Sequence, residues 1–238
     1  MEAALLAWYD EHARDLPWRR TRDPYAILVS EVMLQQTQVA RVVSRYDAWL
    51  ERWPTVKALA DASAADVIRA WQGLGYNRRA LNLHRAARHV AAHGWPEDLT
   101  ELPGVGRYTA DAVARFAYEL DVLPVDTNVR RVLDRTGERF GAEAAHALMD
   151  LGATICLARI PRCSACPLTE RCPSRGKTYA PLRKQGRFEG SFRQRRAQTL
   201  RLVSEGRRRV AQLDGEVVEA LRKDGFVVLE GDRVELAN

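Results

Sequence analysis

The sequence predicts a mainly α-helical protein with a small module of helix and strands at its C-terminus. Apolar residues recur at spacings of three and four from the start of the chain to about residue 152, and no strand-like alternation persists there. Beyond residue 210 the pattern changes to one helix and two short alternating segments. Between these parts lies a loop that contains all four cysteines of the chain.

Prolines divide the helical part into segments. An opening helix carries Leu5 and Trp8, a later one carries Val39, Val43 and Tyr46, and each has charged residues on its other face. The boundaries between helical segments coincide with Pro54, Pro96, Pro103 and Pro124.

The C-terminal part is expected to form a winged-helix-like module. Residues 210–223 have the pattern of a helix, and Asp224-Gly225 follows as a turn. Residues 226–229 and 233–236 read as two strands joined by a tight turn.

Composition and charge describe a basic globular chain. Its 238 residues are 46% hydrophobic, which is enough for one large domain or two smaller ones with a buried core. The formal net charge of +6 and the isoelectric point near 9.4 favour a polyanionic partner. No apolar stretch approaches the ~18 residues that a membrane span requires, and the first residues do not read as a secretory signal. We therefore expect a cytoplasmic protein associated with the nucleoid.

The excess positive charge is concentrated in one segment. Between residues 183 and 210, ten Lys and Arg residues are accompanied only by Glu189 and Glu205. Such a segment is either a solvated linker or a surface that contacts phosphates, and charge alone does not distinguish the two.

The strongest single motif is a cluster of cysteines in the pattern C-x6-C-x2-C-x5-C, formed by Cys156, Cys163, Cys166 and Cys172. Disulfides are disfavoured in a chain expected in the cytoplasm, so the pattern indicates a metal site. Zinc sites usually have two close pairs of ligands, whereas here one close pair is flanked by two single cysteines. The spacing therefore favours a [4Fe–4S] cluster, with zinc as the alternative.

A glycine-rich turn separates two helical segments at Leu102-Pro103-Gly104-Val105-Gly106, followed by Arg107-Tyr108-Thr109-Ala110. Glycines allow close approach of the backbone to a ligand, and the N–H groups of a helix that starts there would form an anion site. An isolated G-x-G string is most often a plain turn, but the longer string is similar to the helix-hairpin-helix motif that binds the DNA backbone. No Gly-Lys-Ser/Thr follows, so we expect no nucleotide cofactor.

Two carboxylates are candidates for acid–base chemistry. Glu31 is the only charged residue between Tyr25 and Ala40, inside an apolar helical segment. Burial would raise the pKa of its carboxyl toward neutrality, as a general acid needs, and the alternative is an ordinary surface glutamate. Asp126 stands where a helix N-cap is expected, and that position would fix it in place and keep it ionised.

Together these motifs resemble the helix-hairpin-helix DNA glycosylases, and most closely the MutY-type adenine glycosylases. The resemblance covers about residues 3–175. It rests on the glycine-rich turn, the cysteine loop and four strings, namely Ser30-Glu31-Val32-Met33-Leu34-Gln35-Gln36-Thr37-Gln38-Val39, Gly73-Leu74-Gly75-Tyr76, Asn82-Leu83-His84 and Val125-Asp126-Thr127-Asn128-Val129. It implies a two-lobed fold, a [4Fe–4S] cluster, and double-stranded DNA with a mismatch or lesion as the partner of a monomeric protein.

The resemblance implies an enzyme of base excision repair. Such an enzyme removes adenine mispaired with 8-oxoguanine or guanine by cutting the N-glycosidic bond of a flipped-out nucleotide. Glu31 would protonate the leaving base and later help to activate water, while Asp126 would stabilise the oxocarbenium-like sugar. Tyr108 and Asn128 match positions that support this pair. The related endonuclease III has a lysine nucleophile at the position of Tyr108, so we expect a monofunctional glycosylase without strand cleavage.

The resemblance also implies contacts with the DNA and the base. Gln36 and Tyr76 match residues that enter the base stack beside the opposing base. The hairpin would contact DNA through Gly104, Gly106, Arg107 and Thr109. The base pocket is expected to include Arg14, Trp18, Leu34 and His146, although Trp18 and Leu34 also fit an ordinary core.

Three departures from the family keep alternatives open. Too few residues follow Cys172 for the family's C-terminal Nudix-like domain, which reads 8-oxoguanine, so we expect that domain to be absent. The segment 133–150 is shorter than in typical members, and Asn77 and Thr127 replace a frequent tyrosine and glycine. The alternatives are a glycosylase for another base, such as T or U opposite G or hypoxanthine, or a non-catalytic iron–sulfur regulator that binds DNA.

The expected domain boundaries follow from these motifs. One lobe combines residues 1–20 with 127–182, including the cysteine loop, and a helical barrel lobe of residues 21–126 contains the hairpin. A basic linker at 183–209 leads to the module at 210–238. Next to a DNA glycosylase core, we expect this linker to contact phosphates.

Overall fold

The computed structural model describes residues 1–180 and 186–238, which form two compact units. The first unit combines residues 1–31 with 105–184, and the second combines 32–104 with 185–238. The C-terminal module, residues 210–238, is part of the second unit. Arg183 and Lys184 of the basic segment lie outside the described residues.

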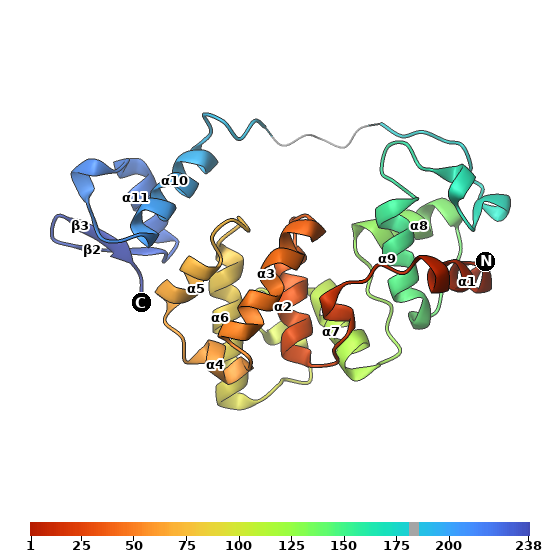
Figure 1. The fold of residues 1–238 in the computed structure, drawn as a ribbon, viewed down its shortest axis with the longest axis horizontal. Helices are drawn as coiled ribbons and strands as arrows, with labels where there is room; N and C mark the ends of the chain where they lie inside the picture. Colours follow the sequence, from red (N-terminus) through yellow and green to blue (C-terminus); the bar gives the residue numbers. More distant parts are fainter. Residues whose placement is uncertain (181–185) are drawn as a thin grey trace. The chain divides into compact units, whose positions relative to one another are not determined.

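The first unit is helical (Figure 1). Its elements are α1 (Glu2–His12), η1 (Pro17–Arg19), the beginning of α2 (Pro24–Leu34), α7 (Arg107–Tyr118), α8 (Thr127–Thr136), η3 (Ala142–Ala144), α9 (Ala145–Thr154), η4 (Cys163–Ala165) and η5 (Thr169–Arg171). Apolar side chains of α1, α8 and α9 form its core, and Leu5, Val129, Val132, Leu148 and Leu151 are at most 1% exposed.

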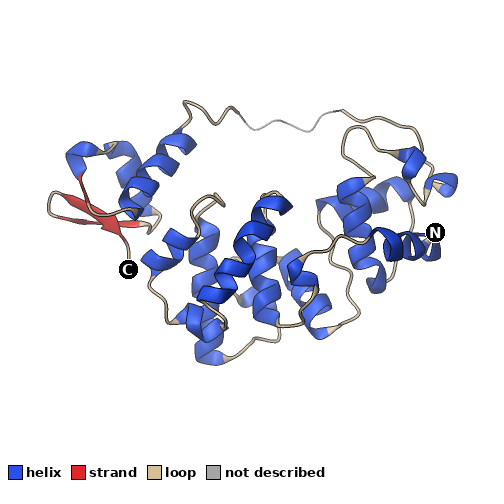
Figure 2. Cartoon of the chain, in the orientation of Figure 1, coloured by secondary structure: helices blue, strands red, loops and turns tan. Residues whose placement is uncertain are grey.

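The second unit contains the remaining helices and the only sheet of the described residues. Its helical elements are α3 (Val39–Arg52), α4 (Val56–Ala60), α5 (Ala64–Ala70), α6 (Arg78–His93), η2 (Leu99–Glu101), α10 (Phe192–Ser204), η6 (Val210–Gln212) and α11 (Gly215–Lys223). Its strands are β1 (Arg208–Arg209), β2 (Val227–Glu230) and β3 (Arg233–Leu236), and Figure 2 shows them beside α10 and α11. They form an antiparallel sheet in the order β1-β3-β2, with Leu229 opposite Val234.

The C-terminal module packs against α5 and α6. Apolar residues of α10, α11 and the sheet share one core with Ala65, Ile68 and Leu81 of those two helices. The predicted strands are observed, whereas the predicted helix begins later than expected, at Gly215, because Asp214 caps it by accepting from the N–H groups of Glu216 and Val217.

The expected linker at 183–209 contains a helix, α10, which buries Leu200 and Val203 in the module core. Several arginines of residues 186–209 form ion pairs with acidic residues of the same segment or of the module. The ion pairs join Arg195 to Asp214 (2.5 Å) and Glu216 (3.0 Å), Arg196 to Asp224 (2.6 Å), Arg207 to Glu230 (3.4 Å), Arg208 to Glu205 (3.6 Å) and Arg209 to Asp232 (3.9 Å).

None of the described helices combines the length and apolarity that crossing a bilayer demands.

A buried carboxylate anchors the N-terminal segment to α9. Asp150 is fully buried, and its oxygens accept hydrogen bonds from the Arg14 Nε (2.7 Å) and from Arg19 Nη1 and Nη2 (2.8 and 2.6 Å). The backbone N–H of Arg14 donates to the same carboxylate at 3.0 Å. Burial raises the pKa of Asp150, but hydrogen bonds from Arg19 and Arg14 outweigh it and hold the pKa below the ordinary value.

Asp150→Asn should therefore lower the free energy of unfolding at pH 7 by about 3 kcal/mol, because it leaves two arginines without their buried partner. A carboxyl with a lowered pKa stabilises the fold above its unfolded pKa of 3.8, and the stabilisation is lost as pH falls through the folded pKa. Urea unfolding at pH 7 and below pH ~3 measures both effects. The exposed Asp47→Asn is the matched control, and equal unfolding of wild type and Asp150→Asn at pH 7 would contradict this account.

Candidate active site

Glu31 is buried in the first unit. It lies on α2, where every residue from Tyr25 to Met33 is buried, and it is 5% exposed. Burial raises the pKa of its carboxyl to about 7, opposed by a hydrogen bond from Tyr108 and the charge of Arg19, while the charge of Asp126 adds to the rise. The Oε2 atom has no hydrogen-bond partner among the described residues. A carboxyl that titrates near neutrality and keeps one oxygen unpartnered is suited to giving and taking a proton.

Tyr108 supplies a neutral hydroxyl next to Glu31. It lies in the first turn of α7 and is half-buried. Burial, together with the nearby carboxylates of Glu31 and Asp126, moves the pKa of its phenol well above the usual range. The hydroxyl therefore stays protonated and remains a donor to the Glu31 carboxyl.

Asp126 is held at the N-terminus of α8. Its Oδ1 accepts from the backbone N–H groups of Asn128 (2.9 Å) and Val129 (2.6 Å), and its Oδ2 accepts from the Asn128 side-chain amide (2.9 Å). The N-terminal end of a helix favours negative charge, and three donors leave the carboxylate little freedom to rotate. This half-buried group is thus a fixed anion.

A chain of hydrogen bonds connects this anion to the cysteine loop. The side-chain Oδ1 of Asn128 accepts a hydrogen bond from Arg131 Nη2 at 2.8 Å, which orients the side-chain amide toward Asp126. The Arg131 guanidinium also donates to the backbone oxygens of Gly152 and Cys156, both at 2.7 Å. Gly152 lies so close to Asn128 that a Cβ there would approach the Asn128 Cβ to 2.8 Å. The position of Asp126 therefore depends on α9 and on the loop that begins at Cys156.

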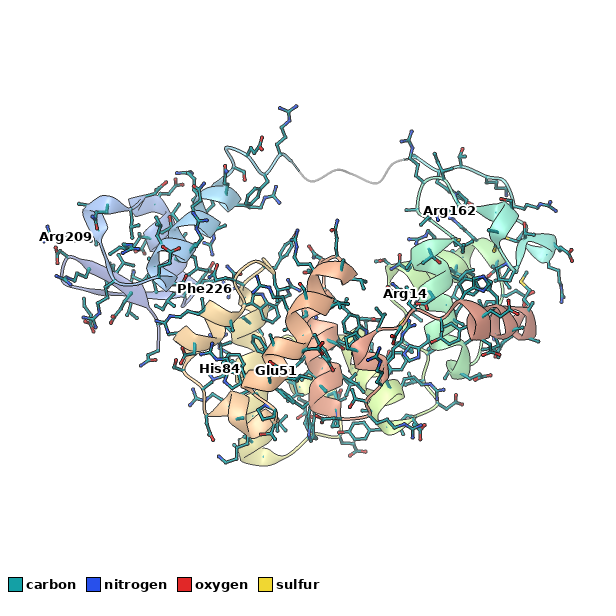
Figure 3. The ribbon with its side chains drawn as sticks, in the orientation of Figure 1. Arg14, Glu51, His84, Arg162, Arg209 and Phe226 are labelled. Carbon is teal, nitrogen blue, oxygen red and sulfur yellow. The ribbon has the colours of Figure 1, made fainter. Side chains whose placement is uncertain are left out.

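A pocket of about 210 Å³ lies in the first unit, and its lining includes Trp18, Arg19, Phe116 and His146. The imidazole of His146 stacks on Phe116 with the ring centroids 4.1 Å apart. Burial and the charge of Arg19 lower the pKa of His146 to about 4, so the ring is neutral at pH 7. The other two residues expected in the base pocket do not line it. Arg14 is held by Asp150, and Leu34 is half-buried in the second unit (Figure 3 labels Arg14).

The four cysteines line one cavity, together with apolar residues that include Val132, Leu151 and Leu168. Two N–H groups reach the sulfurs, from Arg135 to Cys156 and from Gly176 to Cys163, both at 3.4 Å. Across the described part of the chain, no three His, Cys, Asp or Glu side chains converge as a single ion would require. Four thiols that line one cavity, with N–H donors to two of the sulfurs, are a donor set that fits an iron–sulfur cluster.

The second unit presents Gln36 and Tyr76 on two strained loops. Both residues have left-handed backbone conformations, with φ of 55° and 46°, and Tyr76 is 46% exposed. The buried Arg79 joins the loops, because its guanidinium donates to backbone oxygens of both. The acceptors are Val32 (2.7 Å), Met33 (2.9 Å), Gln35 (2.6 Å), Leu74 (3.2 Å) and Gly75 (3.0 Å). Strain held in this way is common at functional sites.

The glycine-rich turn has the predicted features of a hairpin. Gly104 has φ of +79°, and a Cβ there would lie 2.7 Å from the Cβ of Asn82, so only glycine fits. Gly106 precedes the twelve-residue helix α7 without a side-chain cap, and Arg107 is exposed. Thr109 is buried, with 3% exposure, and the expected DNA contact at this position stays a prediction.

The structure thus brings together Glu31, Tyr108, Asp126 and Asn128. It adds Arg19, Asp150 and Arg131, which the sequence analysis missed. Arg19 and Asp150 are 131 residues apart, and no local pattern marks either of them. The signal available for Arg131 was its spacing of three from Asn128 on one helix.

Comparison with known proteins agrees with this geometry. Residues 29–150 match the family described as HhH-GPD superfamily base excision DNA repair protein. The chain is 44% identical to the adenine DNA glycosylase of Mycolicibacterium smegmatis over 88% of this chain and 83% of the relative, and 46% identical to that of Mycobacterium tuberculosis over 82% and 76%. A solved thermostable thymine-DNA glycosylase superposes with a TM-score of 0.64 at 29% identity, covering 72% of this chain and 93% of the other. The chain belongs to the HhH-GPD superfamily of base excision DNA repair proteins and, within it, to the adenine DNA glycosylases.

Proposed function

We propose that the protein removes adenine opposite 8-oxoguanine or guanine in double-stranded DNA, without cleaving the strand. The observation that carries this proposal is the pair of carboxyl groups in the first unit, Glu31 with a pKa near 7 and Asp126 fixed as an N-cap anion. Glu31 is suited to donate a proton and Asp126 is held in place to stabilise positive charge, which is the division of roles that glycosidic cleavage needs.

The reaction follows from these two states. The protonated Glu31 carboxyl donates its proton to N7 of the extruded adenine while the electrons of the N-glycosidic bond move onto the base. The positive charge that develops on the sugar is stabilised by the Asp126 carboxylate. The Glu31 carboxylate then accepts a proton from the water that attacks C1′, which restores the acid. Tyr108 offers no amine for a Schiff base, so the strand stays intact.

The pocket beside Arg19 is proposed to receive the adenine. A neutral imidazole has one donor and one acceptor nitrogen, so His146 could pair with the edge of the base, and Trp18 supplies an apolar wall. Gln36 and Tyr76 are proposed to fill the space left by the extruded nucleotide, and the backbone around Gly104 and Gly106 to bind a phosphate. Arg14 would act on this pocket through Asp150 and through Arg19, whose Nη1 donates to the Arg14 backbone oxygen at 3.1 Å.

The cysteine loop is proposed to hold a [4Fe–4S] cluster ligated by Cys156, Cys163, Cys166 and Cys172, which line one cavity. A cluster bound there would cross-link the loop, whose Cys156 carbonyl accepts from Arg131. Arg131 would then hold Asn128 in place, and Asn128 would hold Asp126.

One prediction of this proposal concerns the base that is released and the role of Glu31 as general acid. Single-turnover assays on duplexes with A opposite 8-oxoguanine, G or C, with T or U opposite G, and with hypoxanthine should show adenine release opposite 8-oxoguanine and G, with strand breaks only after alkali. Glu31→Gln should slow release by about 100- to 10,000-fold, the contribution of a general acid. The exposed Glu51→Gln on α3 is the control (Figure 3). Release of thymine in place of adenine would move the function to the alternative that the thymine-DNA glycosylase similarity suggests.

A second prediction uses the pH dependence of that rate. The acid form of Glu31 is the active one, so the rate should fall as pH rises through its pKa near 7. Tyr108→Phe removes the hydrogen bond that lowers this pKa, so the falling limb should move up by roughly one pH unit. Tyr118→Phe, a change on the exposed end of α7, should leave the profile in place. A limb that moves down, or stays, would show that Tyr108 does not stabilise the Glu31 carboxylate.

Another prediction concerns Arg131, which links the cysteine loop to Asn128 and Asp126. Arg131→Gln frees the Asn128 amide and should slow single-turnover release by about 100-fold, as expected for a misplaced reacting group. Its neighbour Arg130 is exposed, so Arg130→Gln is the matched control. Duplex affinity and iron content separate the effect from a loss of DNA binding or of the loop, and an unchanged release rate would contradict the role of this chain of hydrogen bonds.

A further inference from the structure

The second unit contains a groove of about 720 Å³, and the residues that the C-terminal module contributes to it have no role in the proposed reaction. One side is formed by the loops of Gln36 and Tyr76 and by Arg41 of α3. The other side comes from the C-terminal module, through Phe188 and through Arg193 of α10. The volume is within the range of sites that enclose a nucleotide-sized ligand.

The charge of the groove is positive and largely uncompensated. Arg41, Arg78, Arg79, Arg193 and Arg196 line it, and among the described residues of the lining only Asp224 is acidic. Asp224 is shared by Arg78 and Arg196. Arg193 donates to the backbone oxygen of Gly186 at 2.7 Å, and no carboxylate among the described residues pairs with Arg41 or Arg193.

Several other arginines of the module have acidic partners. Arg195, Arg207 and Arg209 all have acidic partners within the module and do not line the groove. Figure 3 shows Arg209 at the outer edge of the module and Phe226 at the edge next to α6. The module therefore pairs these three arginines with acidic residues, whereas Arg193 beside the groove has no carboxylate partner among the described residues.

Two aromatic rings are exposed along the same groove. Tyr76 is 46% exposed and Phe188 is 51% exposed. Flat exposed rings beside unpaired arginines are the combination that binds a nucleic-acid strand, because arginine attracts phosphate and unpaired bases stack on aromatic rings.

We propose that this groove holds the DNA strand opposite the extruded nucleotide, with the C-terminal module as one wall. The assignment of the strand rests on the proposed function, in which Gln36 and Tyr76 stand beside the opposing base. Arg193 and Arg41 bind phosphates on either side of the groove, and Phe188 stacks on a base of that strand. The module is thus part of the DNA-binding surface of the second unit.

The test measures binding of the full chain to fluorescent duplexes as a function of salt. Arg193→Gln should weaken binding to an A:8-oxoguanine duplex about tenfold at low salt and reduce the slope of log Kd against log salt by about one. Arg209→Gln removes the same charge from the outer face and should bind like wild type. Wild-type binding by Arg193→Gln, or an equal loss in Arg209→Gln, overturns the proposal. Thermal melting of each variant identifies any loss of folding.

Phe188→Ala tests the strand assignment. It should weaken binding to a duplex with an abasic site opposite 8-oxoguanine by about tenfold, and to a fully paired duplex by much less, because only the first offers an unstacked base. An equal loss on both duplexes overturns the assignment of the opposite strand. Adenine release together with wild-type binding by Arg193→Gln sinks this inference and leaves the proposed function intact. DNA binding that depends on the groove, without adenine release, supports this inference and contradicts the proposed function.

Discussion

The pKa of the buried Glu31 carboxyl depends on residues from several segments of the first unit. A carboxyl with 5% exposure is costly to ionise, and its pKa of about 7 reflects a balance between that cost and two stabilising neighbours. One of these, Tyr108, is carried by the first turn of α7. The other, Arg19, is fixed by Asp150 of α9. The acid strength of Glu31 is therefore set by residues from three separate segments, and a shift of any one would change it.

The second carboxylate is controlled by the opposite means. Asp126 is only half-buried and accepts three hydrogen bonds that fix its carboxylate in place, whereas Glu31 is almost fully buried. The two groups are nevertheless coupled, because the negative charge of Asp126 contributes to the raised pKa of Glu31. An anion fixed near a tuned acid thus stabilises developing positive charge on the sugar and also helps to keep the acid protonated.

Local sequence patterns predicted those parts of the site that have local causes. Glu31 stood alone in an apolar segment, and Asp126 stood at a helix start, so both were identified before any contact was known. Arg19 and Asp150 could not be, because their pairing joins residues far apart along the chain. Helix α10 was missed for a related reason. Its arginines obscure the spacing of Leu200 and Val203, and the acids that neutralise them, such as Asp214 and Asp224, come from later segments.

The need to hold two loops together explains why position 79 is an arginine. Two loops with left-handed residues would relax if each were held separately, since such conformations cost about 1–3 kcal/mol each. The planar guanidinium has five donors and reaches carbonyl oxygens of both loops at once, whereas an ammonium has three donors at a single point. Burial lowers the pKa of Arg79 to about 10, so it stays charged at neutral pH. One buried cation therefore fixes Gln36 and Tyr76 relative to each other at the edge of the groove.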